Sequence, residues 1–297
     1  MGSVSLSSAA PLFFLESSRE HFQKDFDRLP FGFSHRFGAD HPLFQLSRMR
    51  RLMENPITRA GIYFDSGQVQ VDQRWDSVPR RPLTMEEAFD SIENSGAWMI
   101  FRRVHLDPDY NDILEECLRD VKALSGRRIE EDRKSQEAMI FVTSPNRITS
   151  YHIDRECNFL MQVRGTKTIH IFNRDDREVT PEQELETFWS RDNNAGIYKQ
   201  QYEDRAHVFA MQPGDGVHIP VNSPHWLQNG NNISISLSIS YQQKDSNRKY
   251  VYQANYYLRK FGLHPTPPGQ HAMLDRGKSL AMAGGLRVKK LLARQPH

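Results

Sequence analysis

Two short stretches of the chain place an aspartate two residues after a histidine, the spacing at which one β-strand presents two metal ligands. They are His152 and Asp154, within SYHIDRECNF, and His105 and Asp107, within RVHLDPDY. Residues i and i+2 of a strand point to the same side, so either pair could hold one ion. Because the chain has 12 histidines and many acids, chance alone supplies such a pair, and the surroundings must choose between them.

A mononuclear iron site for oxygen chemistry needs two histidines and one carboxylate on one side of the metal, with the other side open. For the first pair, a third ligand is available in His225, within NSPHWLQNG, just past a predicted turn and short strand. In the rival pair, Pro108 follows Asp107 directly, which predicts a helix cap rather than a strand. The sequence therefore favours His152, Asp154 and His225 as the ligands of one centre.

Three further histidines lie in strand-like segments and are interpreted as packing residues. His170 alternates with isoleucines and is expected on the outer face of its strand, and His207 and His218 also follow strand patterns. His218 stays open as a ligand because it precedes His225 in the same predicted hairpin.

A lysine lies on the apolar face of the strand-like segment GTKTIHIFN. Lys167 shares that face with Ile169 and Ile171. An ammonium on an inward face is costly unless an anion accompanies it, although a lysine at a strand end can also extend to solvent. Beside the proposed ligands, it is better explained as the partner of a co-substrate carboxylate. Thr149 and Asn158 could add hydrogen bonds to the same acid.

The last strand-like segment, residues 233–240, alternates isoleucine or leucine with serine without a break. One interpretation is an amphipathic strand with a solvated serine face. The favoured interpretation turns the serines toward a ligand cavity, while the aliphatic side chains support the N-terminal helices. The serines are Ser234, Ser236, Ser238 and Ser240.

The elements that must position these residues form the second half of the chain. Short strand-like segments separated by Gly, Pro and Asn indicate a mainly β fold, a double-stranded β-helix (jelly-roll or cupin) core with flanking N-terminal α/β elements and C-terminal helices. The expected strands are 138–145, 150–154, 158–165, 166–173, 207–215, 216–222, 225–230 and 233–242.

Three regions follow from this prediction. Residues 1–100 form a helical and strand region that packs on the core, residues 101–245 form the catalytic core, and residues 246–297 form C-terminal helices. Within the core, the charged insert 174–205 carries a capping-box pattern at Thr180 and an expected helix, and is either solvated surface or a substrate lid. Before the eight strands, we expect helices over 41–55, 83–96 and 109–126 and strands over 61–67, 68–75 and 97–104.

Composition narrows the class of protein. Lys and Arg total 39 against 37 Asp and Glu, so the overall charge predicts no nucleic-acid partner. Two cysteines argue against a disulfide scaffold, and residues 1–16 lack the pattern of a secretory signal or a myristoylation site. Without a run of eighteen apolar residues, no membrane span is expected, and a cytoplasmic location is predicted. The basic C-terminal segment could still contact a partner or a membrane surface.

The combined pattern over roughly residues 101–241 resembles the JmjC and cupin-like family of iron(II)- and 2-oxoglutarate-dependent oxygenases, in the hydroxylase branch typified by factor inhibiting HIF. The joint spacing is more specific than any single motif. The matching stretches are Thr149-Ser150-Tyr151-His152-Ile153-Asp154, Asn158-Phe159, Gly165-Thr166-Lys167, Gly214-Asp215, Ile219-Pro220 and His225.

This resemblance implies roles by position. It implies iron(II), O2 and the co-substrate 2-oxoglutarate, with release of succinate and CO2. Because relatives that transfer halide have lost the carboxylate at the position of Asp154, its presence implies hydroxylation. Ser238 stands where some relatives have an asparagine near the co-substrate. The implied iron ligands are His152, Asp154 and His225, and the implied 2-oxoglutarate contacts are Lys167, Thr149 and Asn158.

Other classes of function stay open at this point. A non-enzymatic cupin-type binding or regulatory protein is the main alternative, and a metal-dependent cupin isomerase or an oxygenase without an oxoacid is a third. The primary substrate is not legible from the sequence: a protein or peptide side chain, an amino-acid-like small molecule and other metabolites all fit. Since related hydroxylases often pair through C-terminal helices, a homodimer is expected.

Overall fold

The computed structural model of the protein describes residues 19–78, 82–129, 133–243 and 247–292. Residues 1–16, for which no secretory signal or myristoylation site is predicted, and the last five residues lie outside the described residues. Within those ranges, no helix is both long and apolar enough to cross a membrane.

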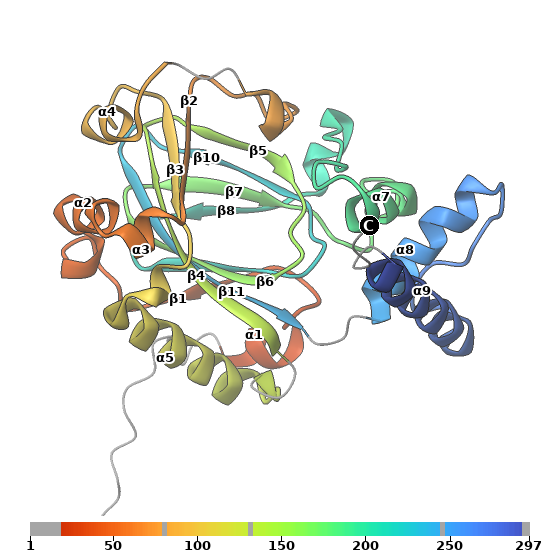
Figure 1. Cartoon of the computed structure of the whole chain (residues 1–297). Helices are drawn as coiled ribbons and strands as arrows, with labels where there is room; N and C mark the ends of the chain where they lie inside the picture. The colour runs from red at the N-terminus through yellow and green to blue at the C-terminus, as the bar shows by residue number, and fades with distance from the viewer. Residues whose placement is uncertain (1–18, 79–81, 130–132, 244–246, 293–297) are drawn as a thin grey trace, which may run out of the picture.

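Two antiparallel sheets face each other and form the jelly-roll predicted from the sequence, with helices around them (Figure 1). The larger sheet has the order β1-β9-β6-β11-β4-β3-β2 and the smaller one β5-β10-β7-β8. The strands are β1 (Phe31–Ser34), β2 (Ile62–Ser66), β3 (Ala97–Phe101), β4 (Arg133–Thr143), β5 (Ile148–His152), β6 (Cys157–Arg164), β7 (Lys167–Ile171), β8 (His207–Met211), β9 (Asp215–Ile219), β10 (His225–Asn229) and β11 (Ser234–Gln243).

The alternation along β11 sorts its side chains between two cores. Ile235, Leu237 and Ile239 face outward and pack in the main hydrophobic cluster with α1 (Arg19–Lys24) and α5 (Pro108–Ser125). The serines face the barrel interior, where they are buried. This confirms the interpretation that the serines point inward and the aliphatic side chains support the N-terminal helices.

The N-terminal region is joined to the barrel through its strands. β1 pairs with β9, and β3 pairs with β4, so both edges of the larger sheet are made by residues that precede the eight core strands. The helices of this region are α1, α2 (Leu46–Glu54), α3 (Pro56–Arg59), α4 (Met85–Asp90) and α5.

Three expectations for the N-terminal region need correction. The helix expected from residue 41 begins at Leu46, because Pro42–Phe44 form a separate 3-10 turn. The helix expected over 83–96 is capped by Thr84 as predicted but ends at Asp90. Residues 68–75 are irregular and turn structure rather than a strand, with Val69 buried and the Val71 carbonyl oxygen accepting from the Tyr151 N–H of β5 at 2.8 Å. Asp107 caps α5 by accepting from the Asp109 N–H, which confirms the helix-cap interpretation of the rival pair.

The insert after β7 contains the expected helix, α7 (Glu182–Ser190), but without the predicted cap. Pro181 is the N-terminal flanking residue and no side chain caps the helix, so the capping-box prediction at Thr180 is wrong; the helix starts one residue too late for it. Leu185 and Phe188 pack against Ile153 and against Tyr252 of α8 (Asn247–Lys260). The insert therefore holds the stretch between two candidate ligands.

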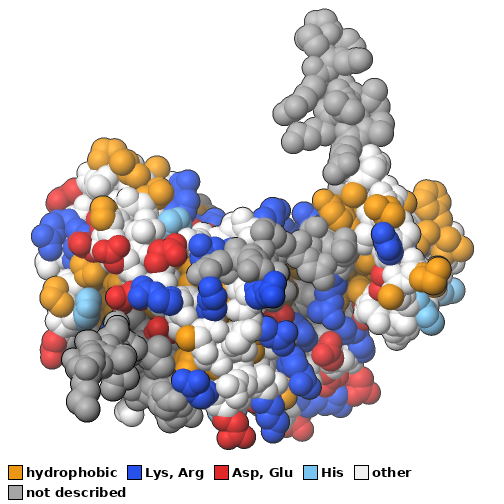
Figure 2. Space-filling view, turned by 90° about the horizontal axis from the view of Figure 1, so that it is seen from below, with side chains coloured by type: hydrophobic (Ala, Val, Ile, Leu, Met, Phe, Trp, Pro, Cys, Tyr) orange, Lys and Arg blue, Asp and Glu red, His pale blue; other side chains and the backbone are white. Residues whose placement is uncertain are grey.

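The C-terminal helices, α8 and α9 (Ala272–Leu292), project beside the barrel (Figure 1). Exposed apolar side chains lie on α9, at Met273 and Leu280, and directly after α8, at Phe261, and apolar side chains gather at one side of the face in Figure 2. Such surface suits self-association. Only one chain is described, so the homodimer stays a prediction.

A buried ion pair ties the N-terminal strands to β5. The Arg147 guanidinium, just before β5, donates to the Asp65 carboxylate of β2 and to the Gly96 carbonyl oxygen, the latter at 3.1 Å. Arg147 and Asp65 are each only 6% exposed. We expect Arg147→Ala to lower the free energy of unfolding by about 3–5 kcal/mol, because it leaves a buried carboxylate without its guanidinium.

Chemical denaturation checks this value, with Arg102→Ala as the control. Arg102 forms an exposed pair with Glu137 at 2.9 Å, and its loss should change the free energy of unfolding by less than about 1 kcal/mol. Equal effects of the two substitutions would contradict the assignment.

Candidate active site

His152 and His225 lie directly opposite each other at one end of the smaller sheet. His152 is the last residue of β5, His225 is the first of β10, and the two are cross-strand partners with ring centroids 4.1 Å apart. Asp154 follows β5, and its Oδ2 lies 3.7 Å from His225 Nε2. One ligand atom from each of the three residues lies within 4.8 Å of the others. The structure thus brings together the three residues that the sequence favoured as ligands.

Backbone carbonyls orient both imidazoles. His152 Nδ1 lies 2.7 Å from the Ser150 carbonyl oxygen, and His225 Nδ1 lies 3.0 Å from that of Ser223. A ring that donates from Nδ1 keeps the lone pair of Nε2 for a metal. Burial, together with the nearby His152, lowers the pKa of His225 to about 4, so His225 is neutral at pH 7. Two imidazoles and one carboxylate form a donor set that suits a divalent transition metal with open positions.

The loop between β9 and β10 supports both Asp154 and His225. Asn222 has a positive φ of 65°, and its N–H donates to the Asp154 carbonyl oxygen at 3.1 Å. The Trp189 indole, at the end of α7, donates to Asn222 Oδ1 at 2.9 Å. The insert therefore fixes the loop that carries one ligand and the backbone of another.

A second support reaches this loop from the N-terminal region. Asp27 Oδ1 accepts from the Val221 N–H at 3.1 Å and from Arg174 Nη1 at 3.3 Å. The Asp27 N–H donates to His218 Nε2 at 2.9 Å, while His218 Nδ1 lies 3.2 Å from the Asn158 carbonyl oxygen. Sequence reasoning missed Asp27 and Trp189, because nothing near either residue in the chain marks it. Asn222 did carry a signal, since asparagine before Ser-Pro suits a left-handed turn.

Lys167, the first residue of β7, is buried as predicted. Its side chain faces inward with Ile169 and Ile171, it is 7% exposed, and it has no hydrogen bond or ion pair with any residue that the structure describes. Burial lowers the pKa of Lys167 to about 7. Ile171 pairs with His225, so Lys167 lies about 13 Å along β7 from the ligand end of the sheet. Among the described residues, the barrel thus holds a cationic group without an anionic partner, deeper in the interior than the candidate ligands.

The other residues predicted near 2-oxoglutarate are divided between the two sheets of the barrel. Thr149 is half-buried on β5, opposite Leu227, and is the closest of them in sequence to His152. Asn158 and Ser238 lie on the larger sheet, where the Ser238 hydroxyl donates to Asn158 Oδ1 at 2.8 Å. Ser238 is therefore linked to the proposed acid site through Asn158.

The remaining histidines are placed outside the ligand cluster. His218 is fully buried between Phe26 and Phe159 on the outer face of the larger sheet, and burial lowers its pKa to about 4. His170 stacks on Trp226 on the outer face of the smaller sheet, as predicted. His105 accepts from the Ala138 N–H at 3.2 Å. The open question of His218 is answered: it is a packing residue.

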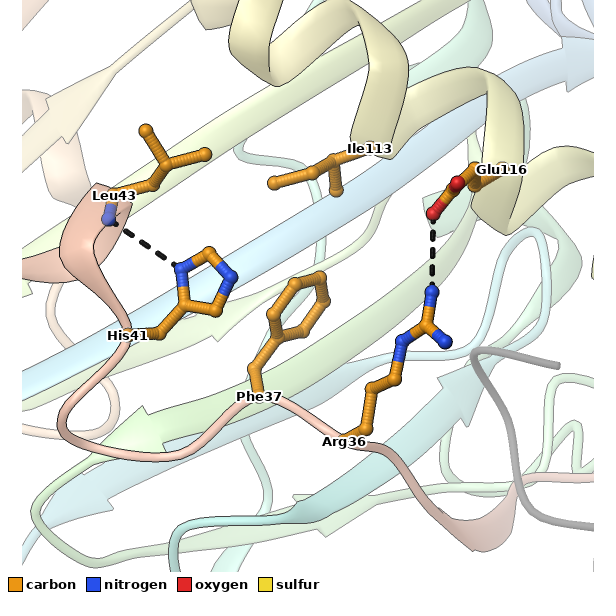
Figure 3. Close-up of a pocket in the computed structure, with 6 residues that line it drawn as sticks. All are labelled: Arg36, Phe37, His41, Leu43, Ile113 and Glu116. Atoms are coloured by element: carbon orange, nitrogen blue, oxygen red, sulfur yellow. Dashed lines mark hydrogen bonds and ion pairs between the residues drawn. The ribbon is translucent and has the colours of Figure 1, made fainter. Parts of the chain in front are cut away.

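A pocket of about 270 Å³ outside the barrel carries no comparable chemistry (Figure 3). It lies between α5 and the segment after β1. Its Arg36 donates to Glu116 at 3.2 Å, and His41 accepts from the Leu43 N–H at 3.4 Å, so its charged groups are engaged with each other or with the backbone. The candidate chemistry is therefore at the end of the smaller sheet.

The fold and the cluster together define a double-stranded β-helix with a His-Asp-His group at its open end. Among solved structures, YcfD, a ribosomal oxygenase from Escherichia coli, is similar to this chain over 96% of this chain and 68% of that one, at 15% identity and a TM-score of 0.51. YcfD in complex with cobalt and 2-oxoglutarate aligns over 93% of this chain and 67% of that one, at 14% identity and a TM-score of 0.52. A complex of YcfD with cobalt and succinic acid aligns with 15% identity, coverages of 93% and 67%, and a TM-score of 0.51.

No family model matches the chain, and no curated protein matches its sequence. At this level of identity, the likeness to YcfD shows the fold. The roles of individual residues must therefore rest on the geometry of this chain.

A divalent metal should distinguish the two histidine-aspartate pairs. We expect Co(II) at about 100 times its dissociation constant to raise the melting temperature by about 5 °C, because it binds the folded state only. His152→Ala should abolish this rise, since it removes one of three ligands. Differential scanning fluorimetry with and without Co(II) measures it.

His105→Ala is the matched control, because it alters the rival pair and should keep the metal-induced rise. Loss of the rise in His105→Ala, or its persistence in His152→Ala, would refute the assignment.

Proposed function

We propose that the protein is an iron(II)- and 2-oxoglutarate-dependent dioxygenase that hydroxylates a C–H bond. One observation carries this proposal: Lys167, a buried lysine without an anionic partner among the described residues, lies in the same barrel as an oriented His-Asp-His cluster. Structural cations in a protein interior are normally paired, so an unpaired one indicates a ligand site. A dicarboxylic oxoacid, with one end near the metal and the other at Lys167, fits this arrangement.

The stoichiometry of the proposed reaction is 2-oxoglutarate, O2 and a substrate C–H group to succinate, CO2 and a C–OH group. Iron(II), when bound, would supply the activation of O2 and the oxidative decarboxylation of the oxoacid. His152, Asp154 and His225 would hold it from one side. Lys167 would bind the distal carboxylate of 2-oxoglutarate, with Thr149 and Asn158 as further hydrogen-bonding groups, and the apolar interior would exclude water.

The chain's own residues also prepare the site for substrate. The insert packs beside the ligand stretch through Phe188 and Trp189, and Arg155 lies over both rings at 5.0 and 5.3 Å. These side chains would form one wall of the entrance. A protein or peptide side chain, or an amino-acid-like small molecule, would enter there. The description of YcfD as a ribosomal oxygenase supports placing protein substrates first.

Succinate formation tests the proposal without knowledge of the primary substrate. Purified protein with iron(II), ascorbate and 2-oxoglutarate should form succinate slowly in uncoupled turnover. Lys167→Ala should lower kcat/KM for 2-oxoglutarate by about 100-fold or more, because it removes the buried ammonium offered to the distal carboxylate. Quantifying succinate by NMR gives the rates.

Lys134→Ala controls for loss of a lysine, since Lys134 is exposed on β4 and its removal should change the rate less than about twofold. Wild-type protein that neither forms succinate nor binds 2-oxoglutarate would support the non-enzymatic cupin alternative. Turnover that Lys167→Ala leaves intact would favour an oxygenase without an oxoacid.

The lowered pKa of Lys167 predicts pH-dependent binding. In the free protein Lys167 loses its proton above about pH 7, and a bound carboxylate favours the charged form, so binding raises its pKa. Below pH 7, Lys167 is already protonated in the free protein, so binding takes up no proton. Above pH 7, Lys167 must gain one proton when 2-oxoglutarate binds, so the affinity for 2-oxoglutarate should fall by up to tenfold per pH unit.

Isothermal titration of the Co(II)-loaded protein with 2-oxoglutarate from pH 6 to 9, in buffers of different ionisation enthalpy, measures both affinity and proton uptake. Lys167→Arg keeps its charge across this range and should bind with a flat pH profile. A flat profile in the wild type would contradict the role of Lys167.

A further inference from the structure

The insert helix α7 is held on one side by α8 (Figure 1). Arg259 Nε of α8 lies 2.7 and 3.0 Å from the two carboxylate oxygens of Glu186, which is only 1% exposed. Three residues further along α7, the Trp189 carbonyl oxygen accepts from Gln253 Nε2 at 2.9 Å. Because a buried carboxylate is costly without its cationic partner, these contacts fix the end of α7 on α8.

The Trp189 side chain extends from this anchored end toward the candidate ligands. Its indole lies parallel to the Tyr252 ring of α8, with ring centroids 6.5 Å apart and an interplanar angle of 3°. Its Nε1–H donates to Asn222 Oδ1 at 2.9 Å. An indole offers one donor and no acceptor, so this bond uses the whole hydrogen-bonding capacity of the side chain. The position of Asn222 is therefore tied to α8 through Trp189.

Asn222 connects Trp189 to both ligand-bearing segments. Its N–H donates to the Asp154 carbonyl oxygen at 3.1 Å, and the carbonyl oxygen of the next residue, Ser223, lies 3.0 Å from His225 Nδ1. Asn222 is 2% exposed and has a positive φ, a conformation that costs a non-glycine residue free energy unless its neighbours hold it. A shift of Asn222 would therefore move Asp154 and His225 together.

We propose that Trp189 is a positioning residue of the metal centre, through which α8 holds Asp154 and His225 at the separation that a metal requires. This inference rests on the proposed function, because it needs a metal at the His-Asp-His cluster, and it extends the site to a helix that contributes no ligand. Removing a group that orients metal ligands through hydrogen bonds commonly weakens metal binding by about 10–100-fold. Metal affinity should therefore depend on side chains of α8, outside the barrel.

Direct binding of Co(II) tests the role of Trp189 without turnover. Trp189→Phe keeps a ring beside Tyr252 but loses the indole donor. We expect its dissociation constant for Co(II) to rise about tenfold, with an altered visible absorption spectrum of the bound Co(II). A visible-absorption titration measures both, and far-ultraviolet circular dichroism shows whether the variant is folded. Trp75→Phe is the matched control, since Trp75 is 47% exposed and its replacement should leave the constant and the spectrum unchanged.

Substitutions at Asn222 separate the hydrogen bond from general packing. Asn222→Gly adopts the positive φ without strain but lacks the Oδ1 acceptor, so it should weaken Co(II) binding as Trp189→Phe does. The double variant should be no weaker than either single variant, because both remove the same bond. Asn222→Asp keeps an acceptor and should bind Co(II) no more than about threefold more weakly than the wild type. Additive losses in the double variant would overturn the inference.

Gln253→Met tests the contribution of α8. Methionine has nearly the length of glutamine but cannot donate to the Trp189 carbonyl oxygen, so we expect Co(II) binding to weaken by about threefold. Tyr257→Phe, at a side chain of α8 that is 48% exposed, should have no effect. A folded Trp189→Phe or Gln253→Met that binds Co(II) like the wild type overturns the inference and leaves the proposed function standing. A wild type that binds no Co(II) refutes both.

Discussion

The pairing of β5 with β10 is the constraint on which the candidate site depends. It places His152 opposite His225 although the two are distant in the chain, and it requires β7 on the other side of β10 to complete the sheet. A register shift between His225 and Leu227 accompanies this pairing. Because a slip of one residue turns every side chain of a strand to the opposite face, the same hydrogen bonds that build the sheet also decide whether the imidazoles meet.

Lys167 shows a conflict between stability and function inside the same barrel. Its ammonium is surrounded by the apolar interior, and the lowered pKa reflects how poorly that interior solvates a charge. Replacing such a group with an apolar one commonly stabilises a fold, so its presence is best explained by the ligand it can bind. Ser240 is a smaller example of the same cost to stability, since its buried hydroxyl has no hydrogen-bond partner among the described residues.

Much of the core could be predicted from sequence because strand parity is a local property. Alternation alone placed Lys167 inward and His170 outward, and the eight strands follow the expected segments. Local patterns failed where tertiary contacts decide. Residues 68–75 alternate like a strand, but their backbone makes a single hydrogen bond to β5, from the Tyr151 N–H to the Val71 carbonyl oxygen, and not a ladder. At α7, the helix begins one residue later than the capping pattern predicts, after Pro181. Local sequence reasoning could not find the hydrogen bond by which Asp27 supports the loop before β10, because its partner Val221 lies 194 residues later in the sequence.

The contact between Asp27 and Val221 has a consequence for how the protein matures. β1 and Asp27 are made early in synthesis, yet their partners β9 and Val221 come near the end, so the ligand loop is completed only after most of the chain has emerged. Contacts of such long sequence separation form late, since closing the intervening chain costs entropy before any contact forms. The three candidate ligands therefore meet only after the barrel closes, so the proposed metal would bind the closed barrel and not the nascent chain.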